Sequence, residues 1–420
     1  MEISKGTLTP AARMLVVNQF GLCLGFYMVL PFLATYLRDD LGFAAALAGT
    51  VLGIRTLCQQ GLYILGGTAA DRVDPRALIM LGCGLRVVSF GLLATVTSPA
   101  GIIAATALTG VAGAIFSPAV ETYLMHESPG RRAETFTLLN LWGNAGTLLG
   151  PVIGALLLGV DFRIVAATAC VIFGILTVAQ ALVLPGVRRP APEHGVWQAW
   201  RRVFTNRRFL GFTLAGAAYF ALFNQLYLAI PLEAQRVTGH PAAVSAVFIV
   251  STVVGLIAGV RLTKACKRRW STGTSMALGL TLIGAGFLPI AAAAPLTLSA
   301  GEPLSPLPAL VAGLPALLGT AVFSVGITIA NPFMMELIPA VGSERLVGTY
   351  YGFFYLVSSL LAAVISTLTG SLLDLGPAGL RWAPFALLAA VGAAGALGIA
   401  VMQRRGALKV PADPAVSLAL

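Results

Sequence analysis

The feature that most limits what this chain can fold into is a series of long segments without a charged side chain. Met14–Leu37, Ile164–Val187 and Phe209–Leu232 contain no Asp, Glu, Lys or Arg. About 20 apolar residues are enough for an α-helix to cross a bilayer. Only 10% of the residues are charged, whereas soluble globular chains carry about 25%. A soluble domain cannot bury so much apolar surface, so the sequence predicts an all-α integral membrane protein.

We expect twelve transmembrane helices, because the chain contains twelve apolar stretches of sufficient length. They lie near residues 14–37, 43–69, 77–98, 101–126, 135–159, 163–185, 209–232, 240–262, 271–293, 308–335, 346–373 and 382–403. The longest polar break separates six of these helices from the other six. The predicted organisation is a six-helix bundle over 1–187, a cytoplasmic linker over 188–208 and a second six-helix bundle over 209–420.

The distribution of basic residues predicts the orientation of these helices. The loops expected on one side carry most of the 27 lysines and arginines, and such loops face the cytoplasm. Both termini are therefore expected in the cytoplasm, in a multi-pass protein of a bacterial-type inner membrane. Because these loops also account for the net charge of +11, we expect no nucleic-acid partner. The first apolar run is a full-length span with no cleavage site behind it, so no signal peptide is expected.

The sequence lacks the constellations that catalysis or metal binding would require. It contains no P-loop, no Ser-His-Asp set and no Cys/His spacing typical of a metal site. We therefore expect neither an enzyme nor an ATP-driven pump, and no cofactor or bound metal. The expected energy source is a proton gradient, and the expected state is a monomer.

The two halves of the chain resemble one another. "PAVETYLMHESPGR" begins at Pro118 and ends at Arg131, and "PFMMELIPAVGSER" begins at Pro332 and ends at Arg345. Both segments occupy the exit of the fourth expected helix of their half. This match coincides with the six-plus-six layout, so it indicates two pseudo-symmetric bundles, as in secondary transporters.

A stripe of glycines marks the fifth expected helix. In "GTLLGPVIGALLLG", Gly146, Gly150 and Gly154 recur every four residues beside Pro151. Glycine and proline are poor helix formers in water, but small residues let membrane helices approach closely. We interpret the stripe as a packing face that also serves gating, with the fifth helix packed against the other half and bending at Pro151.

Several motifs together resemble the major facilitator superfamily over essentially the whole chain. "GGTAADRVDPRALI" is similar to that family's loop signature G-x-L-a-D-R-x-G-R-[KR], from which Asp74 and Pro75 depart, and "RLTKACKRR" resembles its second copy. "LGFYMVLP" is similar to the first-helix pattern of drug:proton antiporters. "GTLLGPVIGA" matches the antiporter signature G-x-x-x-G-P-x-x-G at every defined position. "GIRTLCQQG", Arg86 and "DFRIVAAT" resemble the MdtH-like branch of multidrug efflux proteins.

This resemblance implies a cytoplasmic gate next to the loop signature. Asp71 would meet the cytoplasmic end of a second-half helix or an arginine, and the contact would break when the cavity opens inward. The expected gate consists of Gly67, Asp71, Arg72, Arg76, Glu127 and Arg131. Many relatives carry an arginine early in the fourth helix, where this chain has Thr106. The proton role proposed for that arginine therefore does not transfer.

Charged residues inside the expected helices are candidates for function, because such groups are costly in a membrane. Arg55 lies near the middle of the second helix, and Arg86 near the middle of the third, where a purely structural role is the alternative. Glu121 lies about 9 Å deeper than Glu127 at 1.5 Å per residue. As the acid deepest in any expected helix, Glu121 is our candidate proton carrier, with Asp71 as a second coupling residue.

Amides and phenols among apolar residues predict a permissive substrate cavity. Together with Arg55, the candidates are Asn18, Gln59, Asn140, Asn144, Tyr219, Asn224, Tyr227, Asn331 and Tyr351. The function expected from these features is proton-coupled efflux of an amphipathic compound across the inner membrane, by alternating access between the halves. Two alternatives remain: an exporter or proton symporter of an anionic metabolite, and a lipid or glycolipid flippase.

Overall fold

The computed structural model describes a helical protein. The described residues are 9–63, 65–66, 69, 73–127, 132–186, 201, 203–296, 304–342, 347–375 and 380–408. In these residues the regular structure is entirely helical, as the apolar runs predict. In lipid every backbone N–H and C=O has to be paired within the protein, and a helix pairs them within each segment.

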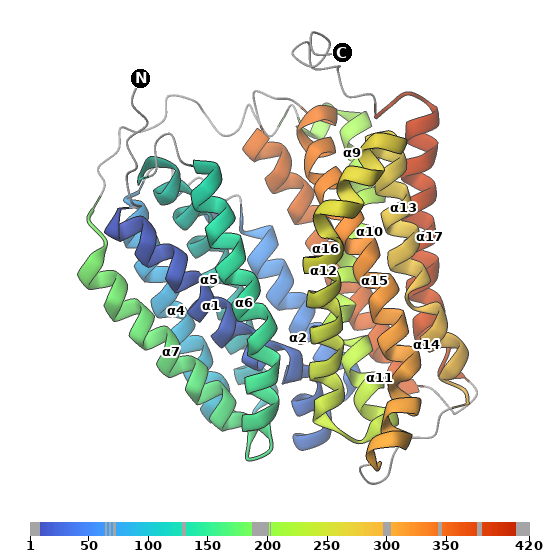
Figure 1. Ribbon diagram of the computed structural model, residues 1–420, viewed down its shortest axis with the longest axis horizontal. Coiled ribbons are helices and arrows are strands. Elements are labelled where there is room, and N and C mark those ends of the chain that lie inside the picture. Colours follow the sequence, from blue (N-terminus) through green and yellow to red (C-terminus); the bar gives the residue numbers. More distant parts are fainter. Residues whose placement is uncertain are drawn as a thin grey trace.

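The helices form two bundles that lie side by side (Figure 1). The first bundle contains α1 Pro10–Thr35, η1 Tyr36–Asp40, α2 Ala45–Thr56, η2 Leu57–Gly61, α4 Pro75–Thr95, α5 Pro99–Glu127, α6 Arg132–Leu158 and α7 Phe162–Val183. The second contains α9 Arg207–Gly216, α10 Ala218–Phe223, η3 Asn224–Leu226, α11 Ala229–Thr238, α12 Pro241–Arg269, α13 Thr272–Ala285, α14 Leu288–Ala293, α15 Pro306–Val341, α16 Val347–Leu375 and α17 Ala383–Arg404.

Eleven of the helical segments in the described residues are long and apolar enough to cross a membrane. They match eleven of the twelve expected helices. The remaining one, expected near 43–69, is represented in the described residues by α2 and the π-helical η2, which together run only from Ala45 to Gly61. The all-α membrane fold is therefore confirmed. The domain boundaries remain a prediction, since residues 187–200 lie outside the described residues.

Local sequence explains why α4 departs from the family's loop signature. Asp74 is the N-cap of α4, and its carboxylate accepts a hydrogen bond of 3.0 Å from the backbone N–H of Arg76. Pro75 follows at the first helical position, where its missing N–H costs nothing. Asp161 caps α7 in the same way, at 2.7 Å from the N–H of Arg163. The unusual Asp-Pro pair is thus a helix start signal.

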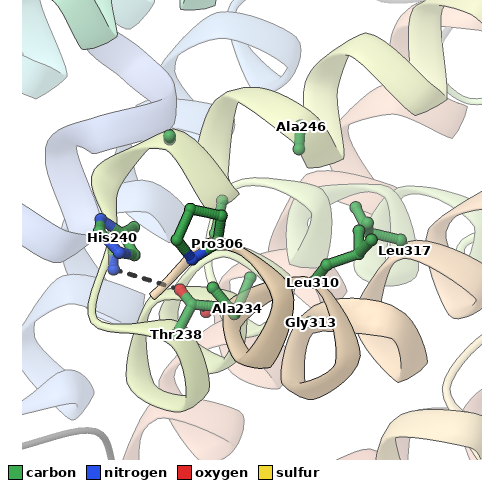
Figure 2. A pocket seen from close by; sticks show the side chains of 11 residues that line it. Ala234, Thr238, His240, Ala246, Pro306, Leu310, Gly313 and Leu317 are labelled. Atoms are coloured by element: carbon green, nitrogen blue, oxygen red, sulfur yellow. Dashed lines mark hydrogen bonds between the residues drawn. The ribbon is translucent and has the colours of Figure 1, made fainter. Parts of the chain in front are cut away.

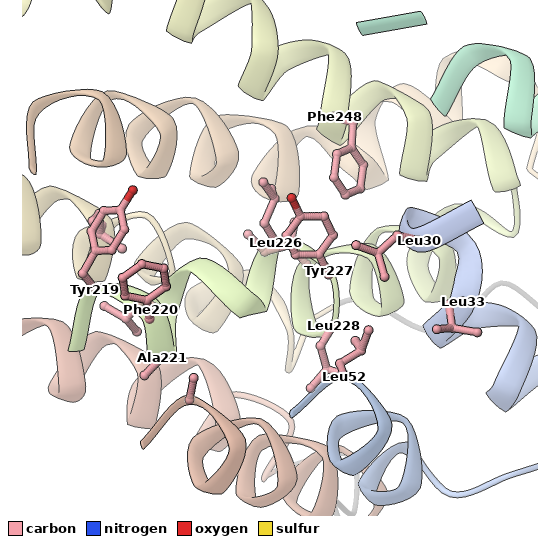
Figure 3. Close-up of a cluster of buried hydrophobic side chains, with 14 of the residues drawn as sticks. Leu30, Leu33, Leu52, Tyr219, Phe220, Ala221, Leu226, Tyr227, Leu228 and Phe248 are labelled. Carbon is pink, nitrogen blue, oxygen red and sulfur yellow. The ribbon is translucent and has the colours of Figure 1, made fainter. Parts of the chain in front are cut away.

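The two bundles meet along α2 with α16 and along α6 with α12, and α1 also contacts α11. At the centre of this junction, Leu52 of α2 lies beside Leu228, and both side chains are buried (Figure 3). We call the side where α1 begins at Pro10 and α17 ends at Arg404 the near side. The opposite side, where η1 ends at Asp40 and α2 begins at Ala45, is the far side.

Candidate substrate site between the two halves

Two interrupted helices face each other where the halves meet. On the first half, α2 changes to the π-helical η2 after Thr56. On the second half, the segment that crosses between Arg207 and Thr238 breaks into α10, η3 and α11 around Asn224. Thr56 Oγ1 donates a hydrogen bond of 2.9 Å to Asn224 Oδ1. Irregular turns of this kind are common at functional sites and at transporter binding sites, so this junction is the first candidate site.

Arg55 is the charged group of this junction. Its side chain is buried, and Nη1 donates to Gln59 Oε1 at 2.7 Å while Nη2 donates to Thr56 Oγ1 at 3.1 Å. The guanidinium lies 5.6 Å from the ring centre of Phe26 and 6.0 Å from that of Tyr227. Four residues that the sequence suggested separately therefore form one cluster that crosses between the halves. They are Arg55, Gln59, Asn224 and Tyr227.

Arg86 provides a second cation close to this cluster. The guanidinium of Arg86 lies 5.6 Å from the ring centre of Phe26, the same distance as that of Arg55. The ring of Phe26 therefore contacts one arginine from each of two helices. The ring centres of Phe116 and Phe173 lie 5.7 and 5.5 Å from the same Arg86 guanidinium. Its Nε and Nη1 atoms have no hydrogen-bond partner among the described residues. Neither Arg55 nor Arg86 forms an ion pair with a described acid, although burying an unpaired charge costs several kcal/mol.

Glu121 belongs to a separate chain of polar and aromatic contacts closer to the near side. The hydroxyl of Tyr63 lies 3.2 Å from each carboxylate oxygen of Glu121. The ring of Tyr63 packs edge-on against Tyr355 of α16, with 5.6 Å between centroids. Tyr355 in turn contacts Tyr351, whose hydroxyl donates to the carbonyl of Met335 at 2.5 Å. Glu121 itself is exposed, so an acid of the first half is coupled to aromatic residues of the second.

Thr56, Tyr63 and Phe26 are residues of these clusters that sequence reasoning missed. For Tyr63 a pattern was available, because Arg55, Gln59 and Tyr63 recur every four residues and share one helix face. Phe26 gives no such signal, since one aromatic residue in an apolar helix looks like any other.

The remaining cavity candidates fall into two groups. Asn140 and Asn144 are exposed on the face of α6 that also carries Pro151, and Asn331 is exposed on α15 one turn before Met335. Asn18 and Tyr219 are buried in this conformation, at 2% and 4% exposed.

Tyr219 is held by its own helix, since its ring stacks parallel to that of Phe223. Asn18 is packed inside the first bundle, and neither side-chain polar atom has a hydrogen-bond partner among the described residues. That these two side chains line the substrate cavity stays a prediction.

The fifth helix, α6, packs against α12 of the second half as expected, but its glycine stripe packs against α1 of its own half. A Cβ atom at Gly150 would lie 2.8 Å from Cβ of Tyr27, and one at Gly146 would lie 2.4 Å from the carbonyl oxygen of Phe20. Contact of α6 with the second half comes instead through Pro151, whose carbonyl oxygen accepts a hydrogen bond of 2.9 Å from Ser245 of α12. The glycines are needed where two backbones of one bundle touch.

The expected cytoplasmic gate is only partly described. Gly67, Asp71, Arg72 and Arg131 lie outside the described residues. Arg76 does not reach the second half: its Nη2 donates at 2.9 Å to the carbonyl oxygen of Ala181 in α7. It thus ties together two helices of the first bundle, because the start of α4 lies against the end of α7. Glu127 is half-buried at the end of α5.

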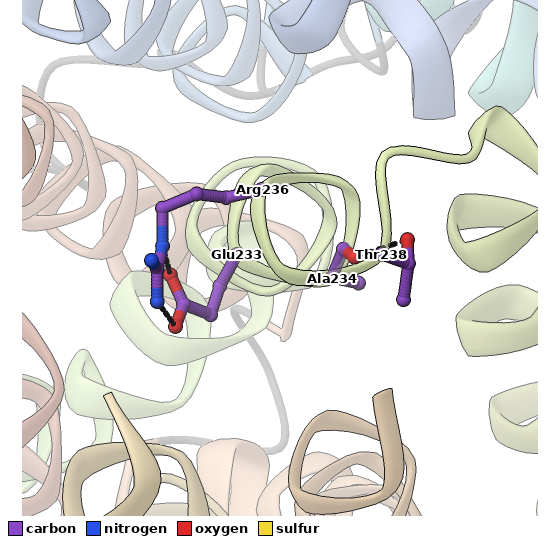
Figure 4. Close-up of polar contacts among 4 residues, drawn as sticks. All are labelled: Glu233, Ala234, Arg236 and Thr238. Atoms are coloured by element: carbon purple, nitrogen blue, oxygen red, sulfur yellow. Dashed lines mark hydrogen bonds and ion pairs between the residues drawn. The ribbon is translucent and has the colours of Figure 1, made fainter. Parts of the chain in front are cut away.

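The sequence singled out Glu121 as the acid deepest in any expected helix, but the described membrane-length segments also contain a buried acid, Glu233. The helix expected to end at Leu232 continues as α11 to Thr238, and Glu233 is 6% exposed. Arg236 neutralises it through two hydrogen bonds, from Nε to Oε2 at 2.7 Å and from Nη2 to Oε1 at 2.5 Å (Figure 4). Because this acid has an arginine as a close partner, Glu121 remains the better proton-carrier candidate.

An apolar cavity of about 240 Å³ lies near the far side, inside the second bundle. Ala234 and Thr238 of α11, Ala246 of α12 and Leu310 and Leu317 of α15 line it (Figure 2). It does not lie between the halves, so it does not serve as the lateral groove that a flippase would need.

Two bundles of membrane-length helices joined by a buried, polar and charged junction define a membrane transporter rather than an enzyme. The family model of the Major Facilitator Superfamily matches residues 15–367, and the chain belongs to that superfamily. An uncharacterized MFS-type transporter of Mycobacterium tuberculosis is 37% identical over 376 residues, covering 89% of this chain and 88% of the relative. Multidrug resistance protein MdtH of Photorhabdus laumondii is 29% identical over 381 residues, 90% of each chain.

Solved structures of two other transporters share the fold. The peptide transporter POT in complex with sulfate superimposes with a TM-score of 0.78 at 16% identity, covering 94% of each chain. The nucleoside transporter NupG gives a TM-score of 0.76 at 14% identity, covering 93% of this chain and 99% of the other. At such identities the likeness concerns the fold. The family and the helices together place the chain in a membrane as a multi-pass protein.

Proposed function

We propose that this protein expels amphipathic compounds across the inner membrane in exchange for protons. The substrate would bind between the halves, near Arg55 and Asn224, and Glu121 would carry the proton. The near side would face the cytoplasm, as the positive loops predict. The observation that carries this proposal is the hydrogen bond between Thr56 and Asn224, because it places two broken helices and a buried cation at the junction that has to rearrange during transport.

Two further observations support the proposal. The relatives named multidrug resistance protein MdtH match most of the chain. Glu121 is exposed and accepts a hydrogen bond from Tyr63, whose ring packs against Tyr355 and so joins the halves. A carboxylate at such a place can exchange a proton with water, and its surroundings change when the second half moves away.

Dye extrusion by cells that produce the protein tests the energy source. Extrusion should collapse when a proton uncoupler is added and should persist when ATP is depleted while the proton gradient is maintained. Cells that produce the Glu121→Gln variant at the same level are the control. Extrusion that follows ATP at constant gradient would overturn the proposal.

An anionic substrate is the second candidate, and the unpaired cations favour it. Arg55 and Arg86 are both buried without a described acidic partner, and Arg55 lies at the junction itself. Proteoliposomes loaded with organic anions or with cationic dyes separate the two candidates. Proton flux coupled to anions alone, and lost in Arg55→Gln, would favour the anion exporter over the drug transporter.

A further inference from the structure

A carboxylate of the second half caps a helix of the first half on the far side. Asp374, in the last turn of α16, accepts hydrogen bonds of 2.8 Å from the backbone N–H of Ala45 at Oδ1 and from that of Ala46 at Oδ2. These N–H groups belong to the first turn of α2, where no intrahelical partner exists. The residue that precedes α2 is Ala44, which has no side chain able to cap it. The cap of α2 is therefore provided across the junction between the halves.

Other helix caps of the first bundle are local. Thr9, Asp74 and Asp161 each accept a hydrogen bond from the N–H groups of the helix that directly follows them. Their caps survive any movement of one half against the other. The cap of α2 does not, because 329 residues of sequence separate Ala45 from Asp374 and the two lie in different bundles.

The contacts around Asp374 show that this end of the junction is closed. A Cβ atom at Gly370, one turn before Asp374, would lie 2.3 Å from the carbonyl oxygen of Ala45, so the backbones of α16 and α2 touch. Next along the pair, the hydroxyls of Thr50 and Thr367 are 3.2 Å apart. On the other side of the junction, Gln235 of α11 donates at 2.9 Å to Asp39 of η1.

We propose that Asp374 is a far-side latch that stabilises the conformation in which this side is closed. The negative carboxylate accepts hydrogen bonds from two N–H groups that have no intrahelical partner, and it lies at the positive end of the α2 dipole. When the halves rock and the far side opens, both hydrogen bonds break, and α2 keeps an uncapped first turn. Asp374 thus sets the equilibrium between the two conformations. The expected Asp71 gate would act at the opposite end of α2.

This inference rests on the rocking of two halves and not on the identity of the substrate. It is tested without substrate and without a proton gradient, so failure of the drug-transport proposal would leave the result unchanged. Spin labels are placed at Val160 and Leu307, which are exposed near the far side on different halves, in the full chain with its native cysteines replaced. The distance between the labels then reports whether the far side is closed.

In Asp374→Ala we expect the population with the longer label distance to increase at least about fivefold over the closed one, because losing a helix cap typically shifts an equilibrium by that factor. Asp374→Asn, which keeps the shape but loses the charge and one acceptor, should give a smaller shift in the same direction. The matched control is Asp161→Ala, which removes a cap within one bundle and should leave the distances unchanged.

Unchanged distances in both Asp374 variants would overturn the latch. So would an equal shift in Asp161→Ala, because the effect would then come from general loosening of the helices. If Asp374→Ala does not fold, Asp374→Asn alone decides between these outcomes.

Discussion

The hydroxyl of Thr56 connects the halves by accepting from Arg55 at 3.1 Å and donating to Asn224 at 2.9 Å. One small side chain thus joins the buried cation of the first half to the broken helix of the second. Because the hydroxyl is buried, each of its partners depends on it for a hydrogen bond. A change at Thr56 on one half is therefore transmitted directly to Asn224 on the other.

Replacing Thr56 with valine should weaken this junction. The variant keeps the shape but leaves Asn224 Oδ1 and Arg55 Nη2 without a partner, which costs about 1–3 kcal/mol when the groups are buried. Thermal unfolding in detergent, with Asn224→Leu and the double variant, measures the coupling energy. Thr252→Val is the control, since its hydroxyl bonds only within its own helix, to Phe248. Additive effects of Thr56→Val and Asn224→Leu would show that the two side chains are not coupled.

Glu121→Gln should uncouple transport from the proton gradient while leaving exchange intact. The amide still accepts from Tyr63 but cannot gain or lose a proton. Counterflow in proteoliposomes should therefore continue, and accumulation against a gradient should stop. Glu336→Gln provides the comparison, because Glu336 is paired with Lys267 at 2.9 Å within the second half. Uphill transport by Glu121→Gln at the rate of the wild type would exclude Glu121 as proton carrier.

Arg55 and Arg86 should respond differently to replacement by methionine. Arg86 is 4% exposed with two nitrogens unpartnered, so exchanging its charge for an apolar side chain should raise the midpoint of thermal unfolding. Arg55 supports Gln59 and Thr56, so Arg55→Met should reduce transport. A fall in stability on Arg86→Met would mean that its stacking on three phenylalanine rings outweighs the cost of burying the charge.

The glycine stripe should be intolerant even of alanine. A Cβ at Gly150 meets Tyr27 at 2.8 Å, so Gly150→Ala should destabilise the first bundle by about 1–3 kcal/mol through overpacking. Gly174 of α7 has no atom within 4 Å of a Cβ, and Gly174→Ala should instead stabilise by about 0.5–1 kcal/mol, since alanine is the better helix former. Equal stability of the two variants would contradict the packing seen between α6 and α1.

The sequence alone determined the class of the protein and most of its helices. Uncharged runs such as Met14–Leu37 have one stable form in lipid, because their backbone groups have to be paired within the segment. The charges at Arg55, Arg86 and Glu121 were visible for the same reason, since each interrupts an otherwise uncharged run. Such inferences need only local information, and the structure confirmed the all-α membrane fold that follows from them.

Only the tertiary structure decided which faces meet. The glycines of α6 could serve contact with either half, and the structure places them on α1 because the close approach is there. Thr56 and Asn224 are 168 residues apart, and Asp374 is 329 residues from Ala45. No local pattern links residues so far apart, because such pairs depend on how two bundles dock. The π-turn at Leu57–Gly61 and the break at Asn224 likewise depend on neighbouring helices, which can override the helix propensity of a single segment.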